Sequence, residues 1–210
     1  MRDRNTPLTP ANLDALAWAT MDGLLPAIVQ DADTGQVLML GYMDRAALEA
    51  TLASGLATFF SRSKVRLWQK GETSGNRLAV KAVLVDCDQD ALLVRAVPEG
   101  PTCHLGTTSC FGTEGPRGGG WLGMLARIVH ERAAAEPAES YTARLLGEGP
   151  ARIAQKVGEE GVELALAAVG RDADGCAEEA ADLLYHLTVL MEAKGFGWDD
   201  VATVLEKRHR

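Results

Sequence analysis

The sequence lacks a long apolar run. Its longest uninterrupted stretch of apolar residues covers residues 164–169, whereas a membrane-spanning helix needs about 20 such residues. We therefore expect no membrane partner. The first residues also lack a basic segment followed by an apolar one, which is the pattern of a secretory signal. Together these absences predict a cytoplasmic protein.

The sequence also lacks an excess of positive charge. Its 21 Lys and Arg residues are outnumbered by 29 Asp and Glu residues, and the net charge is −8. A general nucleic-acid binder neutralises phosphates with a basic surface, so we expect no nucleic-acid partner. Small phosphorylated substrates remain compatible with an acidic protein, because carboxylates can hold Mg²⁺ for them.

A Gly- and Pro-rich segment at residues 112–120 divides the chain. Such a composition is typical of a flexible linker. Before this segment, β-branched residues alternate with polar ones; after it, Ala, Leu and Glu recur at helical spacing. The sequence therefore predicts one domain over residues 1–112, a linker over residues 113–120 and a second domain over residues 121–210.

The first domain is expected to be α+β, with mostly antiparallel strands. A helix is predicted to begin after a cap at Asp44 and to end at Gly55. The expected strands, in hairpin pairs, are residues 27–30 with 37–41, 57–61 with 65–69, and 78–85 with 91–97.

The second domain is expected to be all-helical, with four or five short helices. Their predicted starts are Ser140, Pro150, Asp172 or Asp174, and Asp199. The helix that begins at Asp172 or Asp174 should stop near Gly195. A bundle of this size can need a partner subunit to complete its core.

Cysteine is scarce, yet three of the four cysteines lie close together in the sequence: Cys87, Cys103 and Cys110. The chain is too poor in cysteine for a disulfide framework, so ligands, catalysts or core residues are expected. Three thiolates can hold Zn²⁺ and leave its fourth position for a water, the pattern of catalytic zinc. His104, beside Cys103, is a candidate ligand or general acid/base. The alternative is that these are buried cysteines without a metal.

Three aspartates alternate along the segment that contains the first of these cysteines: Asp86, Asp88 and Asp90. In an extended segment, alternate side chains point the same way. Three neighbouring carboxylates repel one another unless a hard cation such as Mg²⁺ lies among them. The alternative is a polar hairpin turn.

Two clusters of hydroxyl and basic side chains are candidates for binding phosphate. Their members are Ser61, Arg62, Ser63, Lys64, Lys70, Thr73 and Ser74. Spacing alone favours the alternative, two solvated turns.

The second domain carries acidic side chains at helical spacing. Glu159, Glu160 and Glu163 share one side of a helix, and Glu179 and Asp182 share a face of the next. Facing helices can join such groups into a Mg²⁺ or Mn²⁺ site. Lys156, about one turn earlier, can contact a phosphate or pair with a glutamate. The alternative is a solvated acidic face. His186 is interpreted as a core histidine with satisfied hydrogen bonds.

Two sets of motifs resemble known enzyme families. The first set is Ser61-Arg-Ser-Lys64, Leu67-Trp68, Lys70-Gly-Glu-Thr-Ser-Gly75, Asp86-Cys-Asp-Gln-Asp90, Cys103-His104 and Ser109-Cys-Phe111. It resembles phosphoribosyl-AMP cyclohydrolases over residues 12–112. The second set is Ser140-Tyr-Thr142, Ile153-Ala-Gln-Lys-Val-Gly-Glu-Glu160, Glu163 and Glu179-Ala-Ala-Asp-Leu-Leu-Tyr-His186. It resembles phosphoribosyl-ATP pyrophosphohydrolases, which are similar to the all-α MazG-type pyrophosphatases, over residues 121–209.

Joined in this order, the two sets resemble the bifunctional enzymes of histidine biosynthesis. The resemblance implies that the second domain hydrolyses phosphoribosyl-ATP to phosphoribosyl-AMP and pyrophosphate. The first domain would then add water at C6 of the adenine ring and open the N1–C6 bond.

The resemblance also implies roles for the candidate residues. The three cysteines would hold Zn²⁺, drawn from two subunits of a homodimer, and the three aspartates would hold Mg²⁺. The acidic residues of the second domain would hold a further Mg²⁺, with Glu160 or Glu163 as a general base.

Three residues depart from the pattern that this family leads us to expect. Lys64 stands in place of Arg, Asn76 in place of His and Leu105 in place of Thr. These departures affect substrate contacts and none is a proposed metal ligand. Two other functions stay open on the residues alone: a general nucleotide pyrophosphatase fused to a different zinc nucleobase hydrolase, and a structural zinc protein with an interacting helical domain.

Overall fold

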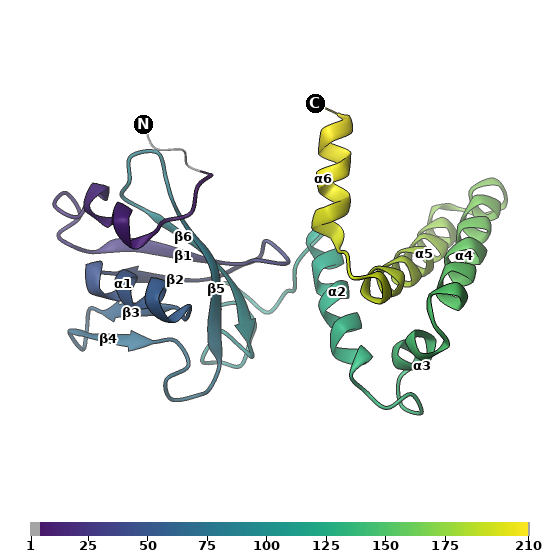
Figure 1. Ribbon diagram of the computed structural model, residues 1–210, viewed down its shortest axis with the longest axis horizontal. Coiled ribbons are helices and arrows are strands. Elements are labelled where there is room, and N and C mark those ends of the chain that lie inside the picture. Colours follow the sequence, from purple (N-terminus) through teal and green to yellow (C-terminus); the bar gives the residue numbers. More distant parts are fainter. Residues whose placement is uncertain (1–4, 210) are drawn as a thin grey trace. The chain divides into compact units, whose positions relative to one another are not determined.

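The computed structural model describes residues 5–209, so the outermost ends of the two expected domains, residues 1–4 and 210, lie outside the described part. The chain divides into two compact units, Met1–Gly120 and Trp121–Arg210. The first is rich in strands and the second is helical, which confirms the expected two-domain layout (Figure 1).

The first unit is built on a four-stranded sheet of order β2-β1-β6-β5. Its strands are β1 (Leu25–Asp31), β2 (Val37–Met43), β5 (Arg77–Val85) and β6 (Leu92–Glu99). The hairpin neighbours β1–β2 and β5–β6 are antiparallel, as predicted. The central pair β1–β6 is parallel, with Ala27 opposite Leu92, and the sequence pattern did not predict this pairing.

Alternation along the two central strands explains where the core lies. Leu25, Ala27 and Val29 on β1 are buried, as are Leu92, Val94 and Ala96 on β6. These side chains share one face because alternate residues of a strand point the same way. The helix α1 (Arg45–Ser54) contributes Ala47 and Leu48 to the same core.

A second, two-stranded sheet joins β3 (Thr58–Ser61) to β4 (Arg66–Gln69). Phe59 on β3 is fully buried and its ring lies 5.2 Å from that of Trp68 on β4. The ring of Phe59 covers Gly41 of β2 so closely that an added Cβ there would come within 2.5 Å of it. A glycine at this position therefore lets the small sheet pack against β2.

The ends of α1 follow the predicted capping residues. The Asp44 carboxylate accepts a hydrogen bond from the Ala47 N–H at 2.7 Å, and Gly55 ends the helix in the left-handed conformation, with φ of 71°. A short 3₁₀ helix, η1 (Pro10–Ala15), precedes the sheet and was not predicted.

The described part of the second unit forms five helices: α2 (Gly120–Ala133), α3 (Tyr141–Glu148), α4 (Pro150–Gly170), α5 (Ala173–Lys194) and α6 (Trp198–Arg208). The long helices α4 and α5 follow each other closely in the chain and pack side by side (Figure 1). The core is small, and its fully enclosed side chains include Val129, Leu145, Ile153 and Val189. Among the described residues, no helix is long and apolar enough to cross a membrane.

The helix starts agree with prediction except in α6. Ser140 and Asp172 cap α3 and α5, and Pro150 opens α4. The cap of α6 is Gly197, not Asp199. Glycine has no capping side chain, and the Asp200 carboxylate instead accepts the Gly197 N–H at 2.8 Å. The expected linker also makes local contacts: Pro116 is buried, and the Gln36 amide donates to the Glu114 carbonyl at 2.8 Å.

Candidate active sites

The first unit contains a cavity of about 460 Å³ where three segments of the chain meet. Its lining residues are Met39, Trp68, Lys70, Ser74, Asn76, Thr102, Cys103, His104, Gly106 and Cys110. They come from β2, from the end of β4 with the turn that follows it, and from the loop after β6. The cavity therefore brings together members of two clusters that the sequence keeps apart, the thiols and the basic hydroxyl-rich loop.

Two of the three predicted zinc ligands lie side by side in this cavity. The Cys110 thiol lies within hydrogen-bonding reach of Cys103. The Leu105 N–H and the Thr107 hydroxyl lower the pKa of Cys103, whereas desolvation and the adjacent Cys103 sulfur raise the pKa of Cys110. The Cys103 thiol therefore loses its proton more readily than the Cys110 thiol, and a soft cation would favour deprotonation of both.

The backbone fixes both sulfurs in place. The Cys110 N–H donates to the Leu38 carbonyl at 2.7 Å, which ties the loop to β2. The Cys103 N–H donates to the Thr107 carbonyl at 2.9 Å. His104 is exposed, and its Nδ1 lies 3.9 Å from the Cys103 sulfur.

Cys87 lies in the turn between β5 and β6, apart from the cavity lining. It is exposed, and its sulfur lies 3.9 Å from Asp88 Oδ1. Among the described residues, the groups that can hold a metal do not include the three thiols together. A single chain therefore brings together Cys103 and Cys110 but not Cys87.

The same turn gathers the three aspartates as predicted. Asp86, Asp88 and Asp90 each offer an oxygen within 4.8 Å of the others. Asp86 also shapes the turn, because its Oδ1 accepts the N–H groups of Asp90 and Ala91 at 3.1 and 3.2 Å. Desolvation and the neighbouring Asp88 raise the pKa of Asp90. This oxygen-only set suits a hard divalent cation.

The basic and hydroxyl residues divide between two places. Lys70 and Ser74 line the large cavity, while Ser61 and Lys64 line a smaller one of about 170 Å³ that shares the wall formed by Trp68. Thr73 and Ser63 line neither of these cavities.

Two arginines of this region contact other side chains of the protein. The Arg62 guanidinium stacks 4.0 Å above the Tyr42 ring. Arg66, which the sequence analysis did not single out, lines the smaller cavity and pairs with Glu72 at 2.6 Å.

In the helical unit, α4 and α5 bring together three of the five predicted acidic ligands. Glu160, Glu179 and Asp182 each offer an oxygen within 4.8 Å of the others. Glu163 lies close enough to these acids to be affected by their charge. The charge of Glu160, then desolvation and the charge of Glu179, raise the pKa of Glu163. The buried member is Glu160, which is 5% exposed.

Glu159 contacts basic and amide side chains rather than the acidic cluster. Its carboxylate lies 2.9 Å from Lys156 Nζ, 2.8 Å from Gln155 Nε2 and 4.0 Å from Arg152. Lys156 and Gln155 lower its pKa as a result. Lys156 also pairs with Glu160 at 3.0 Å, so its ammonium bridges the two glutamates.

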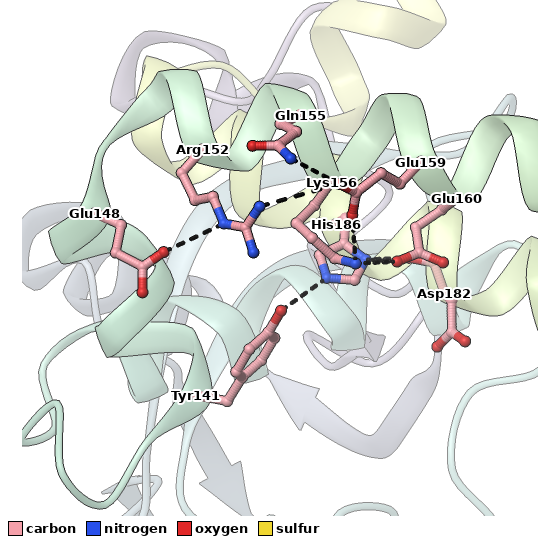
Figure 2. A network of polar contacts seen from close by, with 9 residues as sticks. All are labelled: Tyr141, Glu148, Arg152, Gln155, Lys156, Glu159, Glu160, Asp182 and His186. Carbon is pink, nitrogen blue, oxygen red and sulfur yellow. Dashed lines mark hydrogen bonds and ion pairs between the residues drawn. The ribbon is translucent and has the colours of Figure 1, made fainter.

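Three residues that the sequence did not assign to the site lie at this cluster: Arg171 and His186 contact its acids, and Tyr141 contacts His186. The Arg171 guanidinium pairs with Glu179 at 2.6 Å. His186 is buried, as predicted, but it also lies 3.4 Å from Glu160 Oε1 and 3.2 Å from the Tyr141 hydroxyl (Figure 2). Its spacing from Asp182, one helical turn along α5, was the available signal.

The fold and the two groups of side chains define a two-domain protein with a thiol-lined cavity in one domain and converging carboxylates in the other, features that hydrolases use. Comparison with known families identifies both halves. Residues 39–112 match the phosphoribosyl-AMP cyclohydrolase family, and residues 122–209 match the phosphoribosyl-ATP pyrophosphohydrolase family.

Curated relatives carry both halves in one chain. A protein from Xylella fastidiosa (strain Temecula1 / ATCC 700964) is 58% identical over 98% of this chain and 99% of the relative. Proteins from Escherichia coli (strain K12) and Vibrio cholerae serotype O1 are 53% and 51% identical over 97% and 94% of this chain, and over 100% and 95% of their own lengths. Each is named histidine biosynthesis bifunctional protein HisIE.

The chain belongs to this family of bifunctional histidine-biosynthesis enzymes. It is a bifunctional hydrolase that carries out two consecutive steps, phosphoribosyl-ATP hydrolysis and phosphoribosyl-AMP ring hydrolysis. The resemblance of the sequence motifs is thereby confirmed.

Proposed function

We propose that each compact unit holds one complete activity and that its candidate residues carry it. The helical unit cleaves phosphoribosyl-ATP, and the first unit then opens the purine ring of the product. The observation that carries this proposal is the separation of donor types, since the paired thiols lie in one unit and the converging glutamates in the other. We propose boundaries of residues 1–112 and 121–210 for the two domains.

In the first unit, Cys103 and Cys110 with a partner subunit's copy of Cys87 would hold Zn²⁺. The adjacent sulfurs, the lowered pKa of Cys103 and the exposure of Cys87 away from the cavity support this arrangement. Zn²⁺, when bound, supplies a water whose pKa falls toward ~7.

The remaining residues of the cavity position the substrate and move protons. Water adds at C6, the N1–C6 bond breaks, and N1 takes up a proton. His104 stands at the cavity wall and can transfer that proton. Lys70 and Ser74 in the cavity wall would hold one phosphate, together with Thr73 from the same turn outside the wall.

The smaller cavity and the aspartate turn would serve the rest of the substrate. Ser61, Arg62, Ser63 and Lys64 would hold the second phosphate, with Lys64 as a point charge rather than a bidentate donor. Asp86, Asp88 and Asp90 would hold Mg²⁺, and their mutual distances support this.

In the helical unit, Glu160, Glu163, Glu179 and Asp182 would hold Mg²⁺, which neutralises the triphosphate when bound. Glu163 would also act as the general base toward the water that attacks the α–β linkage, because it lies beside the three acids whose oxygens converge. Lys156 would contact a phosphate. Glu159 would hold Lys156 in place instead of binding the metal. The proposed Mg²⁺ ligands therefore number four instead of the five expected from the sequence. Acids converging from two helices support a MazG-type bundle.

We expect the enzyme to work as a homodimer in the cytoplasm. Val162, Leu166 and Val169 are exposed at 60%, 67% and 90% and follow one another at helical spacing on α4. On the first unit, Leu105 and Phe111 are exposed as well. Apolar side chains left open beside a small core favour association with a second copy.

The test is to incubate the protein with phosphoribosyl-ATP and Mg²⁺ while following pyrophosphate release and the ultraviolet change of ring opening. Cys87→Ala should stop ring opening and leave pyrophosphate release intact. Glu163→Ala should stop pyrophosphate release, and it should still open the ring of phosphoribosyl-AMP when this compound is supplied directly. Loss of both steps from either substitution in a folded protein would contradict the division. Equal turnover of ordinary deoxynucleoside triphosphates would favour a general pyrophosphatase.

A further inference from the structure

His186 occupies a buried position between three helices of the helical unit. It lies on α5, is 6% exposed, and contacts Tyr141 at the start of α3 and Glu160 on α4 (Figure 2). A side chain needed only to fill this space could be apolar, because burying a polar group costs free energy unless every hydrogen bond is made. The polar contacts of the ring therefore require an explanation.

The partners of the ring define which nitrogen carries the proton. Nδ1 lies 3.0 Å from the main-chain carbonyl oxygen of Asp182, which can only accept, so Nδ1 donates. In the neutral ring Nε2 is then an acceptor, and the Tyr141 hydroxyl donates to it at 3.2 Å. The Asp182 carbonyl thus fixes the tautomer, and the contact with the Tyr141 hydroxyl holds the tilt of the imidazole.

The Nδ1–H edge of the ring also faces Glu160. Nδ1 lies 3.4 Å from Glu160 Oε1, and Lys156 Nζ reaches the same oxygen at 3.0 Å. The Lys156 ammonium and the His186 ring thus both lie against one oxygen of the Glu160 carboxylate. An oxygen of the Glu160 carboxylate also lies within 4.8 Å of oxygens of Glu179 and Asp182, the candidate ligand group.

We propose that His186, oriented by Tyr141, is a positioning residue that sets the rotation of the Glu160 carboxylate for Mg²⁺ binding. This inference rests on the proposed carboxylate site of the helical unit. Groups that orient a metal ligand through its free atom commonly change metal affinity when they are removed. Through the contact of Tyr141 with His186, the start of α3 would also support the proposed metal site.

A neighbouring contact provides a matched control. The Tyr185 hydroxyl pairs with Thr142 at 2.8 Å and so joins the same two helices, α3 and α5. It does so without contacting His186 Nε2 through its hydroxyl. Tyr185→Phe therefore removes a hydrogen bond of the same kind between these helices. It leaves intact the contacts from Tyr141 to His186 and from His186 to Glu160. His130→Asn, at an exposed pair with Glu192, controls for loss of a histidine–glutamate contact.

The experiment measures Mn²⁺ binding to the full chain by electron paramagnetic resonance. The helical site is defined as the Mn²⁺ bound by wild type but not by Glu160→Gln. We expect His186→Leu to weaken this binding about 10- to 100-fold. Tyr141→Phe should weaken it less but in the same direction. His186→Asn, whose side-chain amide can replace the Nδ1 donor, should recover most of the affinity. Tyr185→Phe and His130→Asn should bind as wild type.

The results distinguish the positioning role of His186 from the proposed carboxylate site itself. Wild-type affinity in both His186→Leu and Tyr141→Phe would overturn the positioning role, as would equal losses in Tyr141→Phe and Tyr185→Phe. Unchanged Mn²⁺ binding in Glu160→Gln would instead overturn the proposed carboxylate site. If His186→Leu unfolds, as seen by circular dichroism, the comparison of Tyr141→Phe with Tyr185→Phe gives the answer alone.

Discussion

Ionisation of Glu163 is unfavourable in the metal-free protein. The carboxylate of Glu160, desolvation and the carboxylate of Glu179 raise the pKa of Glu163. A raised acid pKa means that the folded state favours the protonated form. The contribution to stability is therefore present below the unfolded-state pKa and is lost as the pH rises through the folded-state pKa.

We accordingly expect Glu163→Gln to raise the melting temperature of the helical unit at neutral pH in the presence of a chelator. At a pH below the ordinary pKa of glutamate the two proteins should melt together. Saturating Mg²⁺ should cancel or reverse the difference, because the ion attracts the charge that otherwise repels its neighbours. Differential scanning calorimetry at two pH values, with and without Mg²⁺, tests this, and a lower melting temperature for Glu163→Gln in chelator would contradict it.

Gly41 is a residue whose role comes from shape alone. A Cβ at this position would lie 2.5 Å from the buried ring of Phe59. We expect Gly41→Ala to lower the free energy of unfolding of the first unit by about 1–3 kcal/mol, because the ring must shift in a packed core. Denaturant unfolding measures this. Gly115→Ala, where an added Cβ has open space, should stay within about 0.5 kcal/mol of wild type.

The donor types of the site could be predicted from single residues, but their partners could not. The aspartates and three of the five helical acids lie together as their spacing predicted, because strands and helices repeat on known periods, whereas only two of the three thiols do. The outward turn of Glu159 toward Lys156 and Arg152 was not, since it depends on which basic residues share its face. His186 was correctly predicted to be buried, yet its contact with Tyr141 crosses 45 positions of sequence.

At the scale of elements, helix starts with a capping side chain were predictable and the one without it was not. Asp44, Ser140 and Asp172 accept backbone N–H groups as expected. Strand positions were also predicted, because alternation shows where a strand runs. The parallel pairing of β1 with β6 was not, because alternation does not show which strand lies beside it.

The cap of α3 allows a test at this scale. The Ser140 hydroxyl oxygen accepts the Ala143 N–H at 3.1 Å and is buried beside the Arg132 carbonyl, to which it donates at 3.2 Å. We expect Ser140→Ala to cost about 1 kcal/mol of helical-unit stability, and Ser140→Thr to retain most of it. Chemical denaturation followed by circular dichroism gives both values. Equal stability of Ser140→Ala and wild type would show that the cap does not contribute.

At the scale of the whole molecule, the place of Cys87 outside the cavity leads us to test the proposed two-subunit zinc site. If zinc ligands come from two subunits, a chain with Cys87→Ala can supply Cys103 and Cys110, and a chain with Cys103→Ala can supply Cys87. Each mixed dimer would then contain one intact and one doubly defective site.

We expect the two inactive variants, refolded together in equal amounts, to regain roughly a quarter of the wild-type ring-opening rate, because half of randomly formed dimers are mixed. The rate should be followed by ultraviolet absorbance. Pyrophosphate release should be unaffected throughout. Mixing that restores no ring opening, in a protein shown to exchange subunits, would place all three thiols in one chain.

The parallel pairing of β1 with β6 also has a consequence for biosynthesis. β1 ends at Asp31, whereas its neighbour on the other side does not end until Glu99. Ribosomes add about 5–20 residues per second, so one edge of β1 waits several seconds for its partner during translation. Until then, the nascent β1–β2 hairpin presents unpaired main-chain groups, which chaperones that bind extended segments would be suited to cover.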